Sequence, residues 1–70
     1  MTADEYRAIL REIGLKQSGE RSMAALLGLS GNAIRQRLSG RNTISAAEQI
    51  VLRLMREGRL TYDEAMALVD

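Results

Sequence analysis

Apolar residues recur at intervals of three and four along almost the whole chain, which is the spacing of one face of an α-helix. Glycines and short polar stretches divide this pattern into five segments. Val, Ile and Tyr stand at helical rather than alternating intervals, so no β-strand is predicted. The predicted helices lie between Thr2 and Gly14, from Met23 to Gly28, from Gly31 to Ser39, between Ser45 and Gly58, and from Thr61 onward.

Three of the predicted helix starts have capping-box spacing, with Ser or Thr three residues before Glu. A cap of this kind stabilises a helix end by about 0.5–2 kcal/mol. A chain of 70 residues has room for one modest hydrophobic core. We therefore predict an all-α fold, a compact bundle of five short helices that forms a single domain over residues 1–70. The capping pairs are Thr2 with Glu5, Ser45 with Glu48, and Thr61 with Glu64.

The sequence contains no Cys and no His. The usual zinc sites, disulfides, thiol chemistry and an imidazole base are therefore excluded, and we expect neither catalysis nor a bound cofactor, metal or small-molecule ligand. No run of about 18 apolar residues is present, and the first residues are acidic rather than the basic, apolar start of a signal segment. The expectation is a soluble, cytoplasmic protein that does not contact membranes.

Positive charge is concentrated in the middle of the chain. The net charge is only +1, yet residues 16–41 contain five basic residues and one acidic residue. No acidic residue occurs between Glu20 and Glu48, and the segments on either side of 16–41 are net negative. The central helices are therefore the part of the molecule most suited to an anionic partner.

The helix predicted from Gly31 to Ser39 has few apolar anchors. At about 100° per residue, turning Ile34 and Leu38 inward places two amides on the opposite side and a guanidinium beside them. In the major groove of DNA, Asn and Gln bond bidentately to adenine and Arg to guanine, each pair contributing about 1–3 kcal/mol of discrimination. We therefore predict that Asn32, Arg35, Gln36 and Ser39 read DNA bases.

Side chains on both sides of this helix are candidates for contacts with the phosphate backbone. Such contacts position a protein on DNA without reading its sequence. The first backbone N–H groups of the helix that begins at Met23 are a further candidate phosphate site. The predicted phosphate-binding side chains are Lys16, Gln17, Ser18, Arg21, Ser30, Arg37, Arg41, Asn42 and Thr43.

The stretch MAALLGLSGNAIRQRLSG resembles the helix-turn-helix of the phage Cro and repressor family, of the xenobiotic-response-element type. The shared features include the small Ala24 in the first helix, Gly28 at the turn and Ser30 as the cap of the second helix. A looser similarity extends from Thr2 to Arg56. The resemblance implies a DNA-binding domain in which the second motif helix enters the major groove, commonly as a dimer on an inverted repeat.

Short members of this kind also resemble autoregulators of phage operons, including those associated with anti-CRISPR genes. Two features depart from the family pattern. Gly19 and Glu20 stand where a cap and a Gln are common, which leaves the expected phosphate clamp open. Arg37 stands where an apolar or aromatic residue is frequent, which is expected to add a charge at the rim that faces DNA.

The helix that begins after Ser45 is apolar around more of its circumference than one small core requires. Leu52 and Met55 lie on a second side of it, which we predict to be a self-complementary dimer contact, with burial under the last helix as the alternative. Residues 45–70 are thus the candidate dimerisation helices. The predicted inner stripe is Ala47, Ile50, Val51 and Leu54.

Together these patterns favour a sequence-specific DNA-binding regulator, a repressor that binds a palindromic operator as a homodimer; control of its own operon is one form of this role. The half-sites would lie one DNA turn apart, ~34 Å. If each subunit neutralised four or five phosphates, log K would fall with log salt with a slope of about −7 to −9. The alternative is a small helical interaction module that presents the same basic face to an acidic protein partner.

Overall fold

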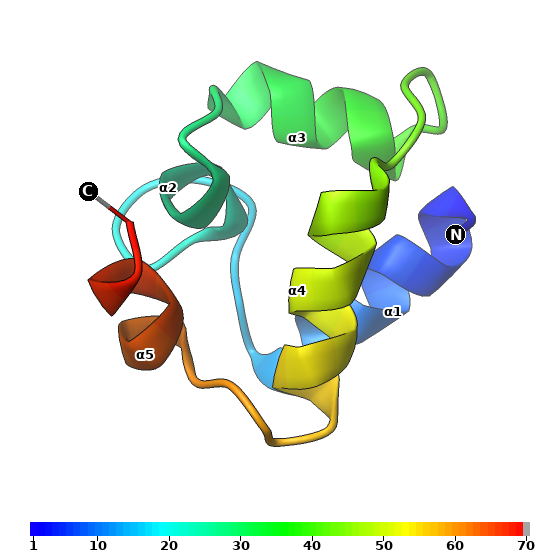
Figure 1. Cartoon of the computed structure of the whole chain (residues 1–70). Coiled ribbons are helices and arrows are strands. Elements are labelled where there is room, and N and C mark those ends of the chain that lie inside the picture. Colours follow the sequence, from blue (N-terminus) through cyan, green and yellow to red (C-terminus); the bar gives the residue numbers. More distant parts are fainter. Residues whose placement is uncertain (70) are drawn as a thin grey trace.

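The computed structural model describes residues 1–69, in which the chain forms five helices and no β-strand (Figure 1). The predicted all-α bundle is thereby confirmed. Asp70, the last residue of the predicted domain and of the candidate dimerisation segment, lies outside the described residues. No helix within residues 1–69 has the length and apolar character needed to cross a lipid bilayer. The helices are α1 (Ala3–Ile13), α2 (Met23–Leu27), α3 (Gly31–Leu38), α4 (Ala46–Arg56) and α5 (Tyr62–Ala67).

The helix starts follow the capping chemistry of the sequence. Thr2 and Thr61 each accept a hydrogen bond from the N–H three residues on, and the Glu at that position accepts one from the backbone N–H of the cap, so both predicted capping boxes are confirmed. Ser45 caps α4 through its side chain. The carboxylate of Glu48, however, bonds to Arg37 rather than to the backbone N–H of Ser45, so the third predicted capping box is only half formed.

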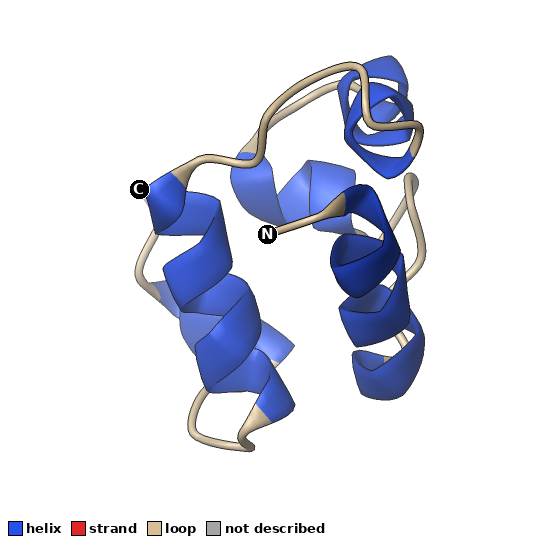
Figure 2. Ribbon diagram, turned by 90° about the vertical axis from the view of Figure 1, so that its right-hand side faces the viewer, coloured by secondary structure: helices blue, strands red, loops and turns tan. Residues whose placement is uncertain are grey.

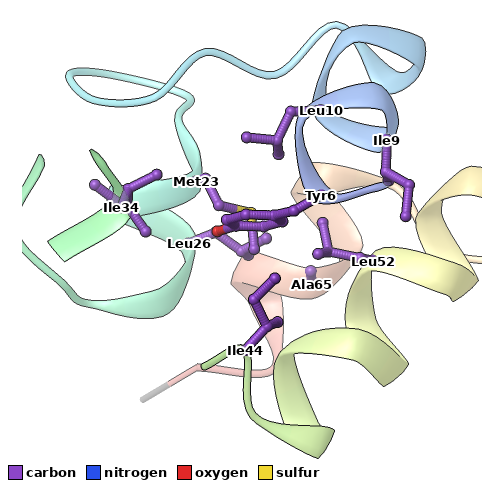
Figure 3. Close-up of a cluster of buried hydrophobic side chains, with 10 residues drawn as sticks. Tyr6, Ile9, Leu10, Met23, Leu26, Ile34, Ile44, Leu52 and Ala65 are labelled. Atoms are coloured by element: carbon purple, nitrogen blue, oxygen red, sulfur yellow. The ribbon is translucent and has the colours of Figure 1, made fainter. Parts of the chain in front are cut away.

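Tyr6 lies at the centre of a core to which all five helices contribute (Figure 3). Its side chain is fully buried, together with those of Met23, Ile34 and Leu52. Its hydroxyl is buried too and has no hydrogen-bond partner within the described residues. α1 and α2 each place three side chains in this core, whereas α3 contributes a single buried one, Ile34. α3 is therefore held by little apolar surface of its own.

α1 packs against both α3 and α4, while α2 packs against α3 and α5. α3 runs across the upper end of the molecule in Figure 1, and the C-terminal ends of α1 and α4 lie at the opposite end. The view from the side shows α1 and α4 running next to each other beneath the level of α3 (Figure 2). This arrangement leaves the face of α3 that lies opposite Ile34 free of any other helix.

The orientation of α4 differs from the prediction. Leu52 has no exposed surface and points into the core, so it cannot form a dimer contact, and that prediction is wrong. Ile50, predicted to lie inward, is 60% exposed. The physical reason is Glu48: because Arg37 neutralises it, the side of α4 that carries this carboxylate can be buried. Met55 is partly buried, and its role in a dimer stays a prediction.

Candidate nucleic-acid interface

The turn between α2 and α3 is built by Gly28, Leu29 and Ser30. Gly28 ends α2 in the left-handed conformation at φ 67°, which residues with a Cβ adopt only at a cost. The backbone N–H of Leu29 then donates to the carbonyl of Ala24 at 2.9 Å. Ser30 follows in an extended conformation, and its hydroxyl accepts from the N–H of Ala33 at 3.1 Å. The chain is thus turned sharply from α2 into α3.

The predicted base readers lie together on the outer side of α3. They border one shallow hollow of about 270 Å³, which Arg41 also lines. Asn32, Arg35 and Ser39 are exposed, and Gln36 is half-buried. The apolar side of the same helix carries Ile34 in the core and Leu38 packed against it. The structure therefore brings all four predicted side chains to one accessible surface.

Hydrogen bonds link these side chains to one another. Arg35 donates from Nη2 to Oδ1 of Asn32 at 2.5 Å. Asn42, which follows α3, donates from Nδ2 to Oε1 of Gln36 at 2.8 Å. The hydroxyl of Ser39 donates to the backbone carbonyl of Gln36 at 3.0 Å. These bonds connect Asn32 with Arg35, and Gln36 with the residues that follow it.

Five exposed residues among the phosphate candidates precede or follow α3 in the chain, and their phosphate contacts stay predictions. Arg41 shares the hollow itself, and Ser30 caps the first turn with its hydroxyl oxygen while its O–H remains able to donate. No ion pair engages Lys16 or Arg41 among the described residues. The candidates in this group are Lys16, Ser30, Arg41, Asn42 and Thr43.

Gln17 and Ser18 contact α3 rather than standing free in front of it. The side-chain amide of Gln17 donates to the carbonyl of Gly31 at 3.1 Å. A Cβ atom added at Gly31 would come within 2.9 Å of the Cβ of Ser18, so a glycine is needed there for the two segments to approach. Both residues therefore brace the start of α3, a role that sequence reasoning missed.

Arg37 does not lie at an open rim, and its predicted phosphate contact is wrong. Its Nε and Nη2 atoms donate to the two carboxylate oxygens of Glu48 at 2.8 and 2.9 Å, and Nη1 donates to the carbonyl of Ala33 at 3.0 Å. The two charged side chains are only 14% and 8% exposed. The hydrogen bond to Glu48 raises the pKa of Arg37, so the guanidinium stays charged and paired. This bidentate pair joins α3 to α4.

Arg21 is directed toward α5 rather than toward α3, and its predicted phosphate contact stays a prediction. Its guanidinium bonds to Asp63 at 2.7 Å and stacks over the ring of Tyr62 with 4.7 Å to the centroid. It lines a groove with Ile13 and Met55, near the C-terminal ends of α1 and α4. Its side chain is 64% exposed beside α5.

The start of α2 has no N–H group left for a phosphate. The N–H groups of Met23 and Ala24 donate to the carbonyls of Lys16 and Gln17 at 2.9 and 3.2 Å. The N–H of Ala25 donates to the hydroxyl of Ser22, the N-cap of α2, at 3.1 Å. The first turn of α2 therefore fastens the preceding loop, and the expectation of an anion site at this helix end is wrong.

Arg7 is a further residue that sequence reasoning missed. From α1, its Nη2 atom donates to the carbonyl of Leu38 at 2.7 Å, at the last residue of α3. Nothing in the local pattern connects two positions that are 31 residues apart. With Gln17 at the first residue and Arg37 next to the last, α3 is bonded to other segments at both of its ends. Polar contacts thus supplement the single buried apolar anchor, Ile34.

No group of three His, Cys, Asp or Glu side chains that could bind a metal forms within residues 1–69. Comparison of the chain with family models, with curated proteins and with solved structures finds no match. What the protein does must therefore be inferred from its own residues and their arrangement.

Proposed function

We propose that this protein is a sequence-specific DNA-binding regulator whose helix α3 enters the major groove. The observation that carries the proposal is the outer surface of α3, where Asn32, Arg35, Gln36 and Ser39 share one hollow opposite the buried Ile34. An α-helix with its side chains is about 10–12 Å in diameter, which fits a major groove about 12 Å wide. α2 lies behind it as the bracing helix that such docking requires.

The charges around α3 support this choice of partner. No acidic residue occurs from Arg21 to Ala47, and the next one, Glu48, is neutralised by its ion pair. Arg35 and Arg41 are therefore exposed beside the amides with no carboxylate among the residues that line the hollow. A surface of this composition attracts the phosphate backbone and offers donors to base edges.

We further propose that two copies bind an inverted repeat, with their α3 helices about one DNA turn apart, ~34 Å. The proposed role is repression, including control of the protein's own operon. Within the candidate dimerisation segment, residues 45–70, Met55 keeps its predicted role and Leu52 does not, because it is buried.

The salt dependence of binding tests the electrostatic part of the proposal. With Arg21 and Arg37 engaged elsewhere, each subunit has Lys16, Arg41 and in part Arg35 for phosphates, which means about four to six contacts per dimer. At −0.9 per phosphate, log K should fall with log salt with a slope of about −4 to −5, shallower than the sequence alone predicts. Fluorescence anisotropy with a labelled duplex measures this slope.

A matched pair of variants makes the measurement specific. Arg41→Ala removes one contact per subunit and should reduce the slope by about 2, whereas Arg56→Ala, at the opposite end of the molecule, should leave it unchanged. A slope near zero, or equal effects of the two substitutions, would contradict the proposed surface. No binding to any duplex at low salt would favour the second hypothesis, an acidic protein partner.

A further inference from the structure

The amide oxygens on the outer surface of α3 are already occupied by donors from the chain itself. Oδ1 of Asn32 accepts from Arg35, and Oε1 of Gln36 accepts from Asn42. In each case the donor belongs to a neighbouring exposed side chain. Each amide oxygen thus has one of its two lone pairs engaged, while each N–H₂ group is still able to donate to a partner.

The bond from Asn42 is supported by the backbone that follows α3. Gly40 has φ 81°, and beyond it the N–H groups of Arg41 and Asn42 donate to the backbone carbonyl of Gln36 at 2.9 and 3.4 Å. The chain therefore folds back over the last turn of the helix and brings the side chain of Asn42 onto that of Gln36. The contact is built by the turn and does not depend on a partner.

Donors consequently outnumber acceptors on this surface, where the hydroxyl oxygen of Ser39 and Oδ1 of Asn42 remain able to accept. The N–H groups of the two amides on α3 stand beside the remaining donors of Arg35 and those of Arg41, all along one hollow. An amide that reads adenine has to accept from the N6 amino group with its oxygen while it donates to N7. Here the adenine amino group would have to share the oxygen of Gln36 with the Asn42 donor that is already bound to it.

Guanine suits such a surface better, because its major-groove edge presents two adjacent acceptors, N7 and O6, and no donor. We propose that α3 reads guanine edges and discriminates against adenine at the position facing Gln36, an inference that rests on the proposed function. In this proposal Asn42 is a positioning residue. It does not contact the base itself but sets the specificity by engaging the oxygen of Gln36.

The first experiment is selection from a random pool of duplex DNA, followed by base analogues in the selected sequence. The proposal expects guanines in each half-site at the positions that α3 faces. Replacing them with 7-deazaguanine, which lacks the N7 acceptor, should lower affinity about tenfold. Inosine, which keeps N7 and O6 and loses only the minor-groove amino group, should change affinity by less than about twofold.

The second experiment tests Asn42 directly. Asn42→Ala frees the oxygen of Gln36, so the preference for guanine over adenine at one position per half-site should fall about tenfold. Arg56→Ala, which removes a side chain at the end of the molecule away from α3, is the control and should leave both the affinity and the preference unchanged. A merely structural role for Asn42 would weaken binding to all duplexes alike and leave the base preference as it was.

The outcomes separate this inference from the function on which it rests. Selection of adenine at these positions, or an unchanged preference in Asn42→Ala, would overturn the inference while DNA binding stands. Failure to enrich any sequence would overturn the proposed function and the inference with it.

Discussion

The ion pair of Arg37 and Glu48 allows a quantitative prediction about how α3 is held. The side chains are 14% and 8% exposed, and three hydrogen bonds of 2.8–3.0 Å fix the guanidinium. Removing one partner of a buried pair leaves an uncompensated charge and costs about 3–5 kcal/mol. Because neither side chain is fully buried, we expect about 3 kcal/mol for Arg37→Met and for Glu48→Leu.

This loss is large for so small a protein. A domain of 70 residues is stable by roughly 4–10 kcal/mol, so either substitution should remove a third or more of the total. The midpoint of thermal unfolding should fall by more than about 10 °C. Arg37→Met combined with Glu48→Leu replaces the pair by apolar side chains of similar size and should return within about 1 kcal/mol of the wild type.

Urea unfolding of the wild type, the two single variants and the double variant measures these free energies as a double-mutant cycle. Asp63→Asn is the matched control, since it removes the exposed pair with Arg21, whose side chains are 78% and 64% exposed, and should cost at most about 1 kcal/mol. Losses below about 1 kcal/mol in both single variants, or losses that simply add in the double variant, would refute the reasoning.

Two further predictions concern close packing and burial. Gly31→Ala should destabilise the protein by about 1 kcal/mol or more despite the higher helix propensity of Ala, because the new Cβ would meet that of Ser18 at 2.9 Å. Adding Ser18→Gly to this variant should relieve the loss. Thermal unfolding measures both effects, and a stabilised Gly31→Ala variant would contradict the close approach. Burial, with the nearby charge of Glu48, raises the pKa of Tyr6 from 10 to about 12, so stability is complete below pH 10 and is lost as the pH rises toward 12. In a Tyr62→Phe variant, phenolate absorbance should therefore appear near pH 12, and its appearance near pH 10 in the folded protein would show that Tyr6 is not buried as described.

The helices were predictable because their signals are local. A capping Thr, an apolar stripe and a terminal glycine lie within one or two turns of each other, and the physical interactions they represent form within the same segment. The boundaries of α1 follow directly from such signals, as does the end of α2 at Gly28, whereas the cap of α2, Ser22, was not predicted. The outer face of α3 was predictable for the same reason, since Ile34 defines the inward direction of a short helix.

The partners of the charged side chains were not predictable, because they come from segments distant in sequence. Arg37 and Glu48 are 11 residues apart and Arg21 and Asp63 are 42 apart, so no periodic pattern links them. The predicted orientation of α4 was wrong for a related reason. An unpaired Glu at position 48 would stay in water. Because Glu48 pairs with Arg37, this side of α4 can be buried, and Leu52 rather than Ile50 lies in the core.

The central claim is that the outer surface of α3 reads DNA bases, and the most direct test is the ratio of affinities for a selected duplex and for a scrambled duplex of equal length. For the wild type the account predicts a ratio of about 10³ or more at physiological salt. Arg35→Ala should lower this ratio about tenfold or more, while Arg56→Ala should leave it unchanged. If Arg35→Ala weakened binding to both duplexes equally, or if the wild type bound both alike, α3 would not read sequence and the account would be contradicted.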